Sequence, residues 1–386
     1  MAMRPARSRA RSTALAAVPL AALGLLAARR LWRHRRRWDL RGRTVLITGG
    51  SRGLGLLIAR ELVAEGARVA VGARDEETLD RARRDLMQRG GPVAAISCDV
   101  TDPVAVERLV RATTDRLGPI DALVNCAGTI TVGPAREMCL EDFHRSMDTN
   151  FWGALHATLA VLPAMRARGA GRIVNVASIG GRVSVPHLLP YSASKFALVG
   201  LSEGLRAELA ADGVQVTTVC PGLMRTGSPR HAWFKGQHRA EYAWFSIADA
   251  LPLVSMDATS AARQVVDALR HGDPDRVLSL PAKVAATVHG LMPGATGGLM
   301  ALANRLLPGP DGQAGRAPVE GVASESSASP SVLTSLGDRA AVLNNQIESG
   351  QIESGQIESA QIESGQIESG QIESGPRAGG EIRTGR

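Results

Sequence analysis

Short apolar runs rich in β-branched residues alternate with longer amphipathic segments from Thr44 to about Leu280. In chain order, the apolar runs read TVLIT, RVAVGA, VAAISCDV, ALVNCAG, RIVNVAS, VQVTTVCPG and RVLSL. Runs of this length fit strands that are buried on both faces, and the intervening segments fit helices. Regular alternation of this kind places the strands in one parallel sheet between two helical layers. The sequence therefore predicts a single doubly wound α/β domain over residues 40–280.

Positive charge is concentrated at the amino terminus. The chain has a formal net charge of +8, and ten arginines fall within the first 40 residues, so the remainder is close to neutral. No later basic stripe is interleaved with aromatic residues, which excludes nucleic-acid binding as a function class. The four cysteines form no C-x-x-C pair and the eight histidines form no H-x-x-x-H pair. The sequence predicts neither a disulfide framework nor a metal site.

An uncharged apolar run, residues 13–28, lies between two arginine clusters of the amino-terminal segment 1–38. As a helix it would extend about 24 Å, against roughly 30 Å for the hydrocarbon core of a bilayer, and the flanking arginines can cover part of the difference. No cleavage-site pattern follows the run, which argues against a secretory signal. We expect a membrane anchor, spanning the bilayer or lying in its interface, that leaves the following domain on the cytoplasmic side.

Two segments follow the predicted domain. Residues 281–307 are apolar and interrupted by glycines, which fits either packing against the domain or a second contact with the membrane. Residues 308–386 are rich in glycine, proline and serine and include six tandem QIESG-type repeats. One isoleucine in five residues suits neither a buried helix nor a buried strand, so we expect 308–386 to be disordered. We assign the repeats no function.

A glycine-rich turn closes the first predicted strand. The sequence TGGSRGLG at residues 48–55 places Gly49, Gly53 and Gly55 ahead of a predicted helix. Glycines let a backbone turn tightly and approach a pyrophosphate, and the free N–H groups of a helix N-terminus favour an anion. Such a turn is a weak signal alone and a specific one directly after the first strand of an α/β domain. We interpret it as a dinucleotide-binding turn.

Tyr191 and Lys195 stand four residues apart in PYSASKFALVG, a predicted helix with small neighbours. Residues at i and i+4 share a helix face, so the ammonium should lie beside the phenol. A nearby positive charge lowers the pKa of a phenol, which would suit the tyrosine to proton transfer. A simple surface contact between the two side chains is the alternative that this stretch leaves open.

Several motifs occur in a fixed order along the domain. They are the glycine turn at 48–55, Asp99–Val100, NCAG at 125–128, Asn150, Ser178, the Tyr191–Lys195 pair and PGLMRT at 221–226. In this order and spacing they resemble the short-chain dehydrogenase/reductase family over roughly residues 40–280. One position departs from the family pattern, since Cys126 stands where a second asparagine is usual. The resemblance implies a Rossmann-type fold, hydride transfer with a nicotinamide cofactor, and a homodimer or homotetramer.

The resemblance also implies a role for each matched residue. Tyr191 would be the general acid or base, tuned by Lys195, and Ser178 would hydrogen-bond the carbonyl oxygen where charge develops. Asn150 would hold a water that links Lys195 to solvent. Contacts with the cofactor are implied for Gly49, Ser51, Arg52, Gly53, Leu54, Gly55, Arg74, Asp99, Val100, Asn125, Ala127, Gly128, Tyr191, Lys195, Pro221, Gly222 and Thr226.

The end of the second predicted strand bears on the choice of cofactor. Ala73 stands where sites that prefer NAD usually carry an acid for the ribose hydroxyls. Arg74 follows it, and Arg52 lies in the glycine turn, so two guanidiniums are available for a 2′-phosphate. We therefore expect NADP rather than NAD. Asp75 could compete one position later, and two solvated surface arginines are the alternative interpretation.

Five aromatic residues fall within residues 233–245, in a chain that is only 3% aromatic. In the family that this chain resembles, the segment after the PG motif is a lid over the substrate. An aromatic lid and the VPHLLP stretch before Tyr191 indicate an apolar pocket for a hydrophobic carbonyl or alcohol. Packing of a helical insert is the competing explanation for the aromatic residues.

Three functions are consistent with these residues. The first is an NADP-dependent, membrane-tethered carbonyl reductase or alcohol dehydrogenase. The second is a catalytically silent NADP-binding scaffold, which would usually lack the tyrosine or the lysine, whereas Tyr191 and Lys195 are both present. The third is an interaction protein that uses its tail, and a partner whose capture needs the tail would favour it.

Overall fold

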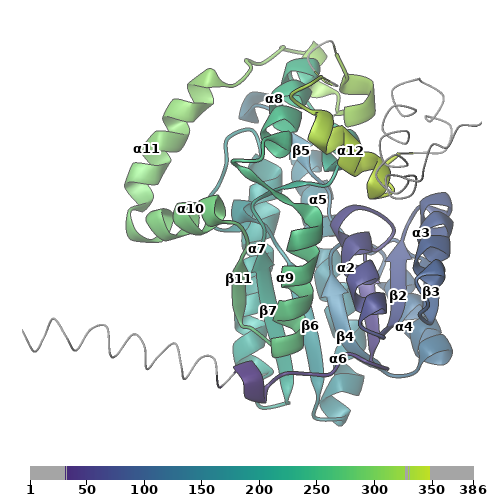
Figure 1. Cartoon of the computed structure of the whole chain (residues 1–386). Helices are drawn as coiled ribbons and strands as arrows, with labels where there is room; N and C mark the ends of the chain where they lie inside the picture. The colour runs from purple at the N-terminus through teal and green to yellow at the C-terminus, as the bar shows by residue number, and fades with distance from the viewer. Residues whose placement is uncertain (1–30, 32, 327–328, 330, 348–386) are drawn as a thin grey trace, which may run out of the picture. The chain divides into compact units, whose positions relative to one another are not determined.

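A seven-stranded parallel sheet forms the centre of the protein (Figure 1). The structure is a computed structural model that describes residues 31, 33–326, 329 and 331–347. The strand order is β11-β7-β6-β4-β1-β2-β3, and every neighbouring pair is parallel. The strands are β1 Thr44–Thr48, β2 Arg68–Ala73, β3 Val93–Ser97, β4 Ile120–Asn125, β6 Gly171–Val176, β7 Val214–Cys220 and β11 Asp275–Val277. The doubly wound Rossmann-type sheet predicted from the sequence is confirmed.

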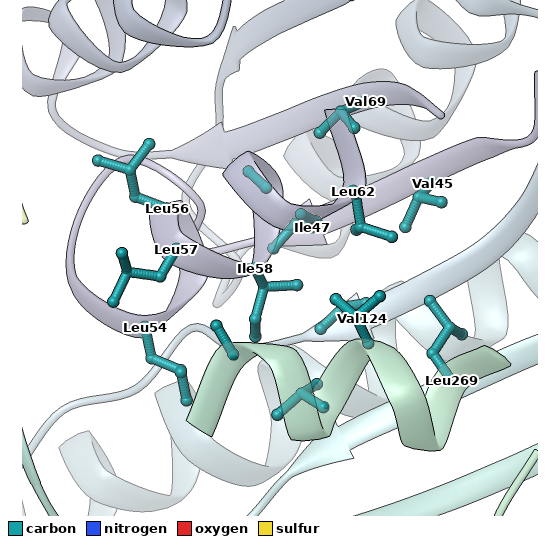
Figure 2. Packing of buried hydrophobic residues seen from close by; sticks show 14 of the residues in the cluster. Val45, Ile47, Leu54, Leu56, Leu57, Ile58, Leu62, Val69, Val124 and Leu269 are labelled. Atoms are coloured by element: carbon teal, nitrogen blue, oxygen red, sulfur yellow. The ribbon is translucent and has the colours of Figure 1, made fainter. Parts of the chain in front are cut away.

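Helices cover both faces of this sheet. One layer contains α2 Gly53–Ala64, α3 Glu76–Gln88 and α9 Ala258–His271, and the other contains α4 Pro103–Leu117, α6 Gly153–Ala167 and α7 Leu189–Glu208. In Figure 2, Leu54, Ile58 and Leu62 of α2 lie among side chains of the sheet and Leu269 of α9. Ile58 and Leu62 are fully buried, so truncating either to alanine should cost about 2–5 kcal/mol of stability.

Short polar side chains begin several of these helices. Asp75 accepts a hydrogen bond from the N–H of Thr78 at the start of α3. Asp102 does the same for Val104 at the start of α4, where Pro103 occupies the first helical position. Asp257 caps α9 through Ser260. Each cap satisfies an N–H group that has no partner within the helix, which fixes where the strand-to-helix loops end.

Smaller elements gather at the carboxyl edge of the sheet. The helical ones are α5 Leu140–Met147, a π-helical turn at Asp148–Trp152, and α8 His238–Ala250. Two minor sheets join β12-β9-β5 and β10-β8. Their strands are β5 Thr131–Val132, β8 Leu223–Arg225, β9 Trp233–Phe234, β10 Ser255–Asp257 and β12 Val319–Glu320. Short 3₁₀ turns occur at Ala135–Glu137, Ile179–Gly181, Ser228–His231, Asn304–Leu306, Ala314–Arg316 and Gly321–Ser324.

Part of the basic amino-terminal segment packs on the α/β domain. The Arg33 guanidinium forms ion pairs with Asp267 at 2.6 Å and Asp273 at 2.8 Å. The Arg172 guanidinium lies 4.1 Å from the ring centre of Trp38. Arg33 and Trp38, which belong to the expected 1–38 segment, therefore contact the α/β domain. Among the described residues no helix combines the length and apolarity needed to cross a bilayer, and the 13–28 run lies outside them.

The carboxyl-terminal region is more ordered than expected. Residues 281–307 fall mostly in α10 Leu280–Leu291 and α11 Pro293–Ala303, whose leucines stay largely exposed. Residues 308–346 also pack, through β12 and α12 Ser335–Leu343, so the expectation of disorder from residue 308 is wrong for this part. The low apolar content of residues 308–346 had suggested disorder. These residues pack instead through small side chains and backbone hydrogen bonds. The expected disorder of 348–386 lies outside the described residues.

Candidate active site

The glycine turn lies between β1 and α2, and its backbone admits no larger residues at two positions. Gly49 has φ +67°, and a Cβ there would lie 2.6 Å from the Ala127 Cα. A Cβ on Gly55 would lie 2.1 Å from the Gly49 carbonyl oxygen. The first turn of α2 is thus drawn tightly against the ends of β1 and β4. This geometry leaves the amino end of α2 facing the cleft, as binding of a pyrophosphate requires.

The cleft runs along the carboxyl ends of the parallel strands. Tyr191, Lys195 and Ser178 line it together with nearly all the residues expected to contact a cofactor. The latter are Gly49, Ser51, Arg52, Gly53, Leu54, Gly55, Arg74, Asp99, Val100, Ala127, Gly128, Pro221, Gly222 and Thr226. Bare glycine backbone, a helix N-terminus and paired guanidiniums form a binding site suited to a dinucleotide with phosphate groups.

Asn125 is the expected cofactor residue that does not line the cleft. It is 3% exposed, and its side-chain amide donates to Asn175 at 2.8 Å and to the Ala154 carbonyl at 3.2 Å. Asn175 in turn donates to Ser202 on α7 at 2.8 Å. This chain of amides ties β4, β6 and two helices together below the cleft. Asn125 therefore supports the site from within the core.

Two arginines, Arg52 and Arg74, line the part of the cleft near the end of β2, where a 2′-phosphate is expected to bind. Arg74 is exposed at the end of β2, and Arg52 lies within hydrogen-bonding distance of His231, 3.1 Å between the two nitrogens. Asp75, the competing acid, is held as the cap of α3, and its hydrogen bonds with Thr78 keep the pKa of that carboxyl below its usual value. Asp75 also lines the cleft, but one of its two carboxylate oxygens is already engaged by the helix cap.

Helix α7 and strand β6 bring the reactive hydroxyl groups together. Pro190 occupies the first turn of α7, and Tyr191 and Lys195 then project on one face. Ser178 follows β6, where its Oγ accepts a hydrogen bond from the Gly180 N–H at 3.0 Å. A Cβ on Gly180 would lie 3.3 Å from Tyr191 Cε1 and 3.5 Å from Ser178 Oγ, so the two side chains are neighbours. Because Ser178 Oγ accepts from the backbone, its own proton can be donated into the cleft.

Burial shifts the pKa values of both side chains of this pair. Removal from water raises the pKa of Tyr191 to about 12, although Ser178 acts in the opposite direction. The expected lowering of the Tyr191 pKa by Lys195 together with a cationic nicotinamide stays a prediction. Removal from water also lowers the pKa of Lys195 to about 8. Both shifts disfavour the charged form, as desolvation does. With a pKa of about 8, Lys195 is still mostly charged at neutral pH and can favour the phenolate of Tyr191.

Asn150 lies in the π-helical turn between α5 and α6 and is 1% exposed. Its Oδ1 accepts from the Thr129 N–H at 2.9 Å, and its Nδ2 donates to the Ser194 hydroxyl at 2.9 Å. A Cβ on Gly128 would lie 3.1 Å from Asn150 Oδ1 and 3.7 Å from Lys195 Nζ. Asn150 therefore sits beside Lys195 and joins the loop after β4 to α7. Such π turns are frequent at functional sites.

The aromatic cluster is mainly packing, as the competing explanation held. Phe234, Tyr242 and Phe245 are at most 5% exposed and pack together in T-shaped pairs. They form a small core with Val132 and Leu188, separate from the sheet core. Only Trp233 of the five aromatic residues lines the cleft. The apolar character of the substrate end therefore depends on fewer side chains than the sequence suggested.

Sequence analysis missed several residues that the fold brings to the cleft. His231, Glu320 and Gln346 line it from segments beyond the PG motif. Gln346 is 5% exposed, although it begins the first tandem repeat. No sequence signal marked these residues, because each reaches the cleft through tertiary contacts of a loop or a turn. The buried acid Asp249, which accepts a hydrogen bond from the Met224 N–H, also carried no sequence signal, and burial raises its pKa to about 7.

A parallel sheet, a glycine turn after its first strand, and a cleft lined by Ser178, Tyr191 and Lys195 are typical of a nicotinamide-dependent oxidoreductase. Residues 43–233 match the model of the family described as short chain dehydrogenase. The chain belongs to the short-chain dehydrogenase family.

Relatives of known sequence and structure agree with this assignment. The chain is 44% identical over 183 residues to a putative ketoacyl reductase of Streptomyces coelicolor, covering 47% of this chain and 70% of that protein. A tryptophan variant of actinorhodin polyketide ketoreductase with NADPH superimposes with a TM-score of 0.56 at 35% identity, over 61% of this chain and 95% of that one. A gluconate 5-dehydrogenase of Burkholderia cenocepacia with NADP and tartrate superimposes with a TM-score of 0.57 at 27% sequence identity. The match covers 64% of this chain and 98% of that one. Both structures contain the NADP-type cofactor expected from Arg52 and Arg74.

Proposed function

We propose that this protein reduces a carbonyl group on an apolar molecule with NADPH, or runs the reverse oxidation with NADP. The observation that carries the proposal is the convergence of Ser178, Tyr191 and Lys195 on the cleft that the glycine turn opens. NADPH would supply the hydride when bound, held by the turn at 48–55 and by Arg52 and Arg74. Similarity to ketoacyl and polyketide ketoreductases supports a β-ketoacyl chain as the first substrate class to test.

Each residue has a chemical task in this reaction. The Tyr191 hydroxyl donates its proton to the substrate oxygen as that oxygen gains negative charge. The Ser178 hydroxyl donates a hydrogen bond to the same oxygen and stabilises the developing charge. Lys195, next to Tyr191, favours the phenolate that remains after proton transfer. Asn150 joins Thr129 to Ser194 on α7 and so helps to position the helix that carries Tyr191 and Lys195. A water beside Asn150 that links Lys195 to solvent is also part of the proposal.

The proposal is tested by mixing the full chain with NADPH and a panel of carbonyl compounds, including β-ketoacyl thioesters of increasing chain length. Loss of NADPH absorbance that rises with chain length supports an apolar substrate. NADPH binding without turnover across the panel would favour a silent scaffold instead. The third candidate, an interaction protein that uses its tail, would be favoured by a partner captured by the full chain but lost when residues 348–386 are removed.

We further propose that the amino-terminal segment tethers the protein to a membrane with the α/β domain on the cytoplasmic side. The apolar run 13–28 between arginine clusters supports this, since basic residues next to such a run favour the cytoplasmic side. A chain that begins at residue 31 keeps Arg33 and Trp38, which pack on the domain. It should remain folded and leave the membrane fraction, and continued sedimentation after a salt wash would contradict the tether. Light scattering of the same truncated chain would test the expected homodimer or homotetramer.

A further inference from the structure

The segment Ser335–Gln346, which we call the strap, lies across one end of the cofactor cleft. It consists of α12 and the three residues that follow it. Helix α12 packs on α8 and β8. A Cβ on Gly227 would lie 2.4 Å from the Ala341 Cβ, so the helix rests directly on the loop that follows the PG motif. The strap lies outside residues 43–233, the part of the chain that matches the family model.

The end of the strap is bound to the glycine turn. The Gly53 N–H donates to the Asn344 carbonyl at 2.8 Å. The Asn345 side-chain amide donates to the carbonyls of Ser51 at 2.8 Å and Thr78 at 2.9 Å, and its oxygen accepts from Arg81 at 2.8 Å. Asn345 adopts φ +57°, which asparagine tolerates better than most residues. Its side chain therefore fixes the strap to the turn that begins the cofactor site.

Gln346 lies inside the cleft with one polar atom unused. The side chain is 5% exposed, and a Cβ on Gly53 would lie 2.7 Å from its Nε2. The Gln346 carbonyl is 2.8 Å from the His231 Nε2, which fixes its backbone. Its side-chain Oε1 is buried and has no hydrogen-bond partner within the part of the chain that the structure describes. A buried acceptor without a partner is costly, so this oxygen favours a ligand that brings a donor.

We propose that Gln346 is a cofactor-binding residue whose Oε1 accepts a hydrogen bond from a ribose hydroxyl of the dinucleotide, and that Asn345 is the positioning residue that holds it there. A dinucleotide in this cleft carries ribose hydroxyls that can donate, whereas its phosphates only accept. The strap thus contributes cofactor contacts from a segment that lies outside residues 43–233, the part that matches the family model. This inference rests on the proposed binding of NADPH.

The test compares NADPH binding by the full chain and three variants, using isothermal titration or fluorescence. Gln346→Ala should raise the Kd for NADPH about three- to tenfold, as expected for one hydrogen bond between neutral groups. Asn345→Ala should raise it by a similar factor through release of the strap. The matched control Gln313→Ala, at an exposed position of the same region, should leave Kd unchanged. At saturating NADPH, kcat should stay at the wild-type value in both strap variants while the KM for NADPH rises.

Each other outcome overturns the inference. A Kd for Gln346→Ala within twofold of wild type would show that the oxygen contacts no cofactor group. Tighter binding in either strap variant would show that the strap excludes the cofactor. The Gln346 side chain makes no hydrogen bond with the described residues, so Gln346→Ala keeps the test valid even if Asn345→Ala fails to fold. Absence of NADPH binding by the wild-type chain would instead overturn the proposed function, and this inference with it.

Discussion

The Lys195 ammonium lies 5.7 Å from the centre of the Tyr191 ring and donates its hydrogen bond to the Val176 carbonyl at 3.0 Å. The lysine therefore contacts the end of β6 and lies beside the phenol ring. This arrangement fixes the distance between the two side chains through the backbone of the sheet. Burial of the phenol raises its pKa, so a positive charge held at this distance is what would favour its ionised form.

Replacing Tyr191 with Phe should reduce kcat to a few per cent of wild type or less, because only the proton donor is removed. NADPH affinity should change little, since the ring and its neighbours remain. Steady-state kinetics and a binding titration on the same sample check both points. Turnover above a few per cent would show that another group supplies the proton.

Replacing Lys195 with Met should move the rising limb of the pH–rate profile for alcohol oxidation to higher pH. Oxidation needs the phenolate of Tyr191, and burial already raises the pKa of that phenol. A neighbouring positive charge favours the phenolate, so loss of the ammonium should raise the pKa of Tyr191 further. A profile of kcat against pH that is the same in both proteins would contradict any tuning of Tyr191 by Lys195.

Replacing Arg74 with Ala, or Ala73 with Asp, should shift preference from NADP toward NAD. Loss of one charge-assisted hydrogen bond to a phosphate costs about 1.5–3 kcal/mol, which corresponds to roughly ten- to a hundredfold in the ratio of kcat/KM for the two cofactors. Arg84→Ala, on the exposed side of α3, is the matched control and should leave the ratio unchanged. An unchanged ratio in the Arg74 variant would assign the phosphate to other groups.

Replacing Asp249 with Asn should flatten the dependence of stability on pH. Burial raises the pKa of Asp249 from 3.8 to about 7, so between these values the native state holds a proton that the unfolded chain releases. Stability present at low pH is therefore lost as the pH rises to about 7, by up to roughly 4 kcal/mol. Urea unfolding at pH 5 and pH 8 should show a smaller difference in the variant. Equal differences in both proteins would place the Asp249 pKa near its usual value.

Local patterns predicted the sheet and the candidate Tyr191–Lys195 pair, and tertiary contacts account for the rest. The β-branched runs located every strand of the main sheet, because burial on both faces leaves a continuous apolar sequence. The spacing of Tyr191 and Lys195 located the reactive pair, because it is a property of one helix. Asn345 and Ser51 meet across 294 positions, through backbone atoms and a polar side chain that carry no periodic signal.

The aromatic segment 233–245 is a second case in which the sequence alone could not predict the tertiary contacts. Clustering in the sequence singled out Phe234, Tyr242 and Phe245, but it could not tell a pocket lining from a small core. That choice depends on where α8 lies relative to Leu188, which only the three-dimensional packing decides. Composition similarly suggested disorder for residues 308–346, because glycine and serine are common both in disordered chains and in close backbone packing.

The π-helical turn at Asp148–Trp152 divides a helical stretch from residue 140 to 167 into two parts with different phases. Before the turn, the buried positions are polar, Asp142 and Ser146, and α5 packs against α7. After it, Ala157, Val161 and Met165 face the sheet. One additional residue in that turn thus rotates the whole downstream helix about its axis. Removing a residue there would restore a regular helix and turn either Asn150 away from Lys195 or the apolar stripe of α6 away from the core.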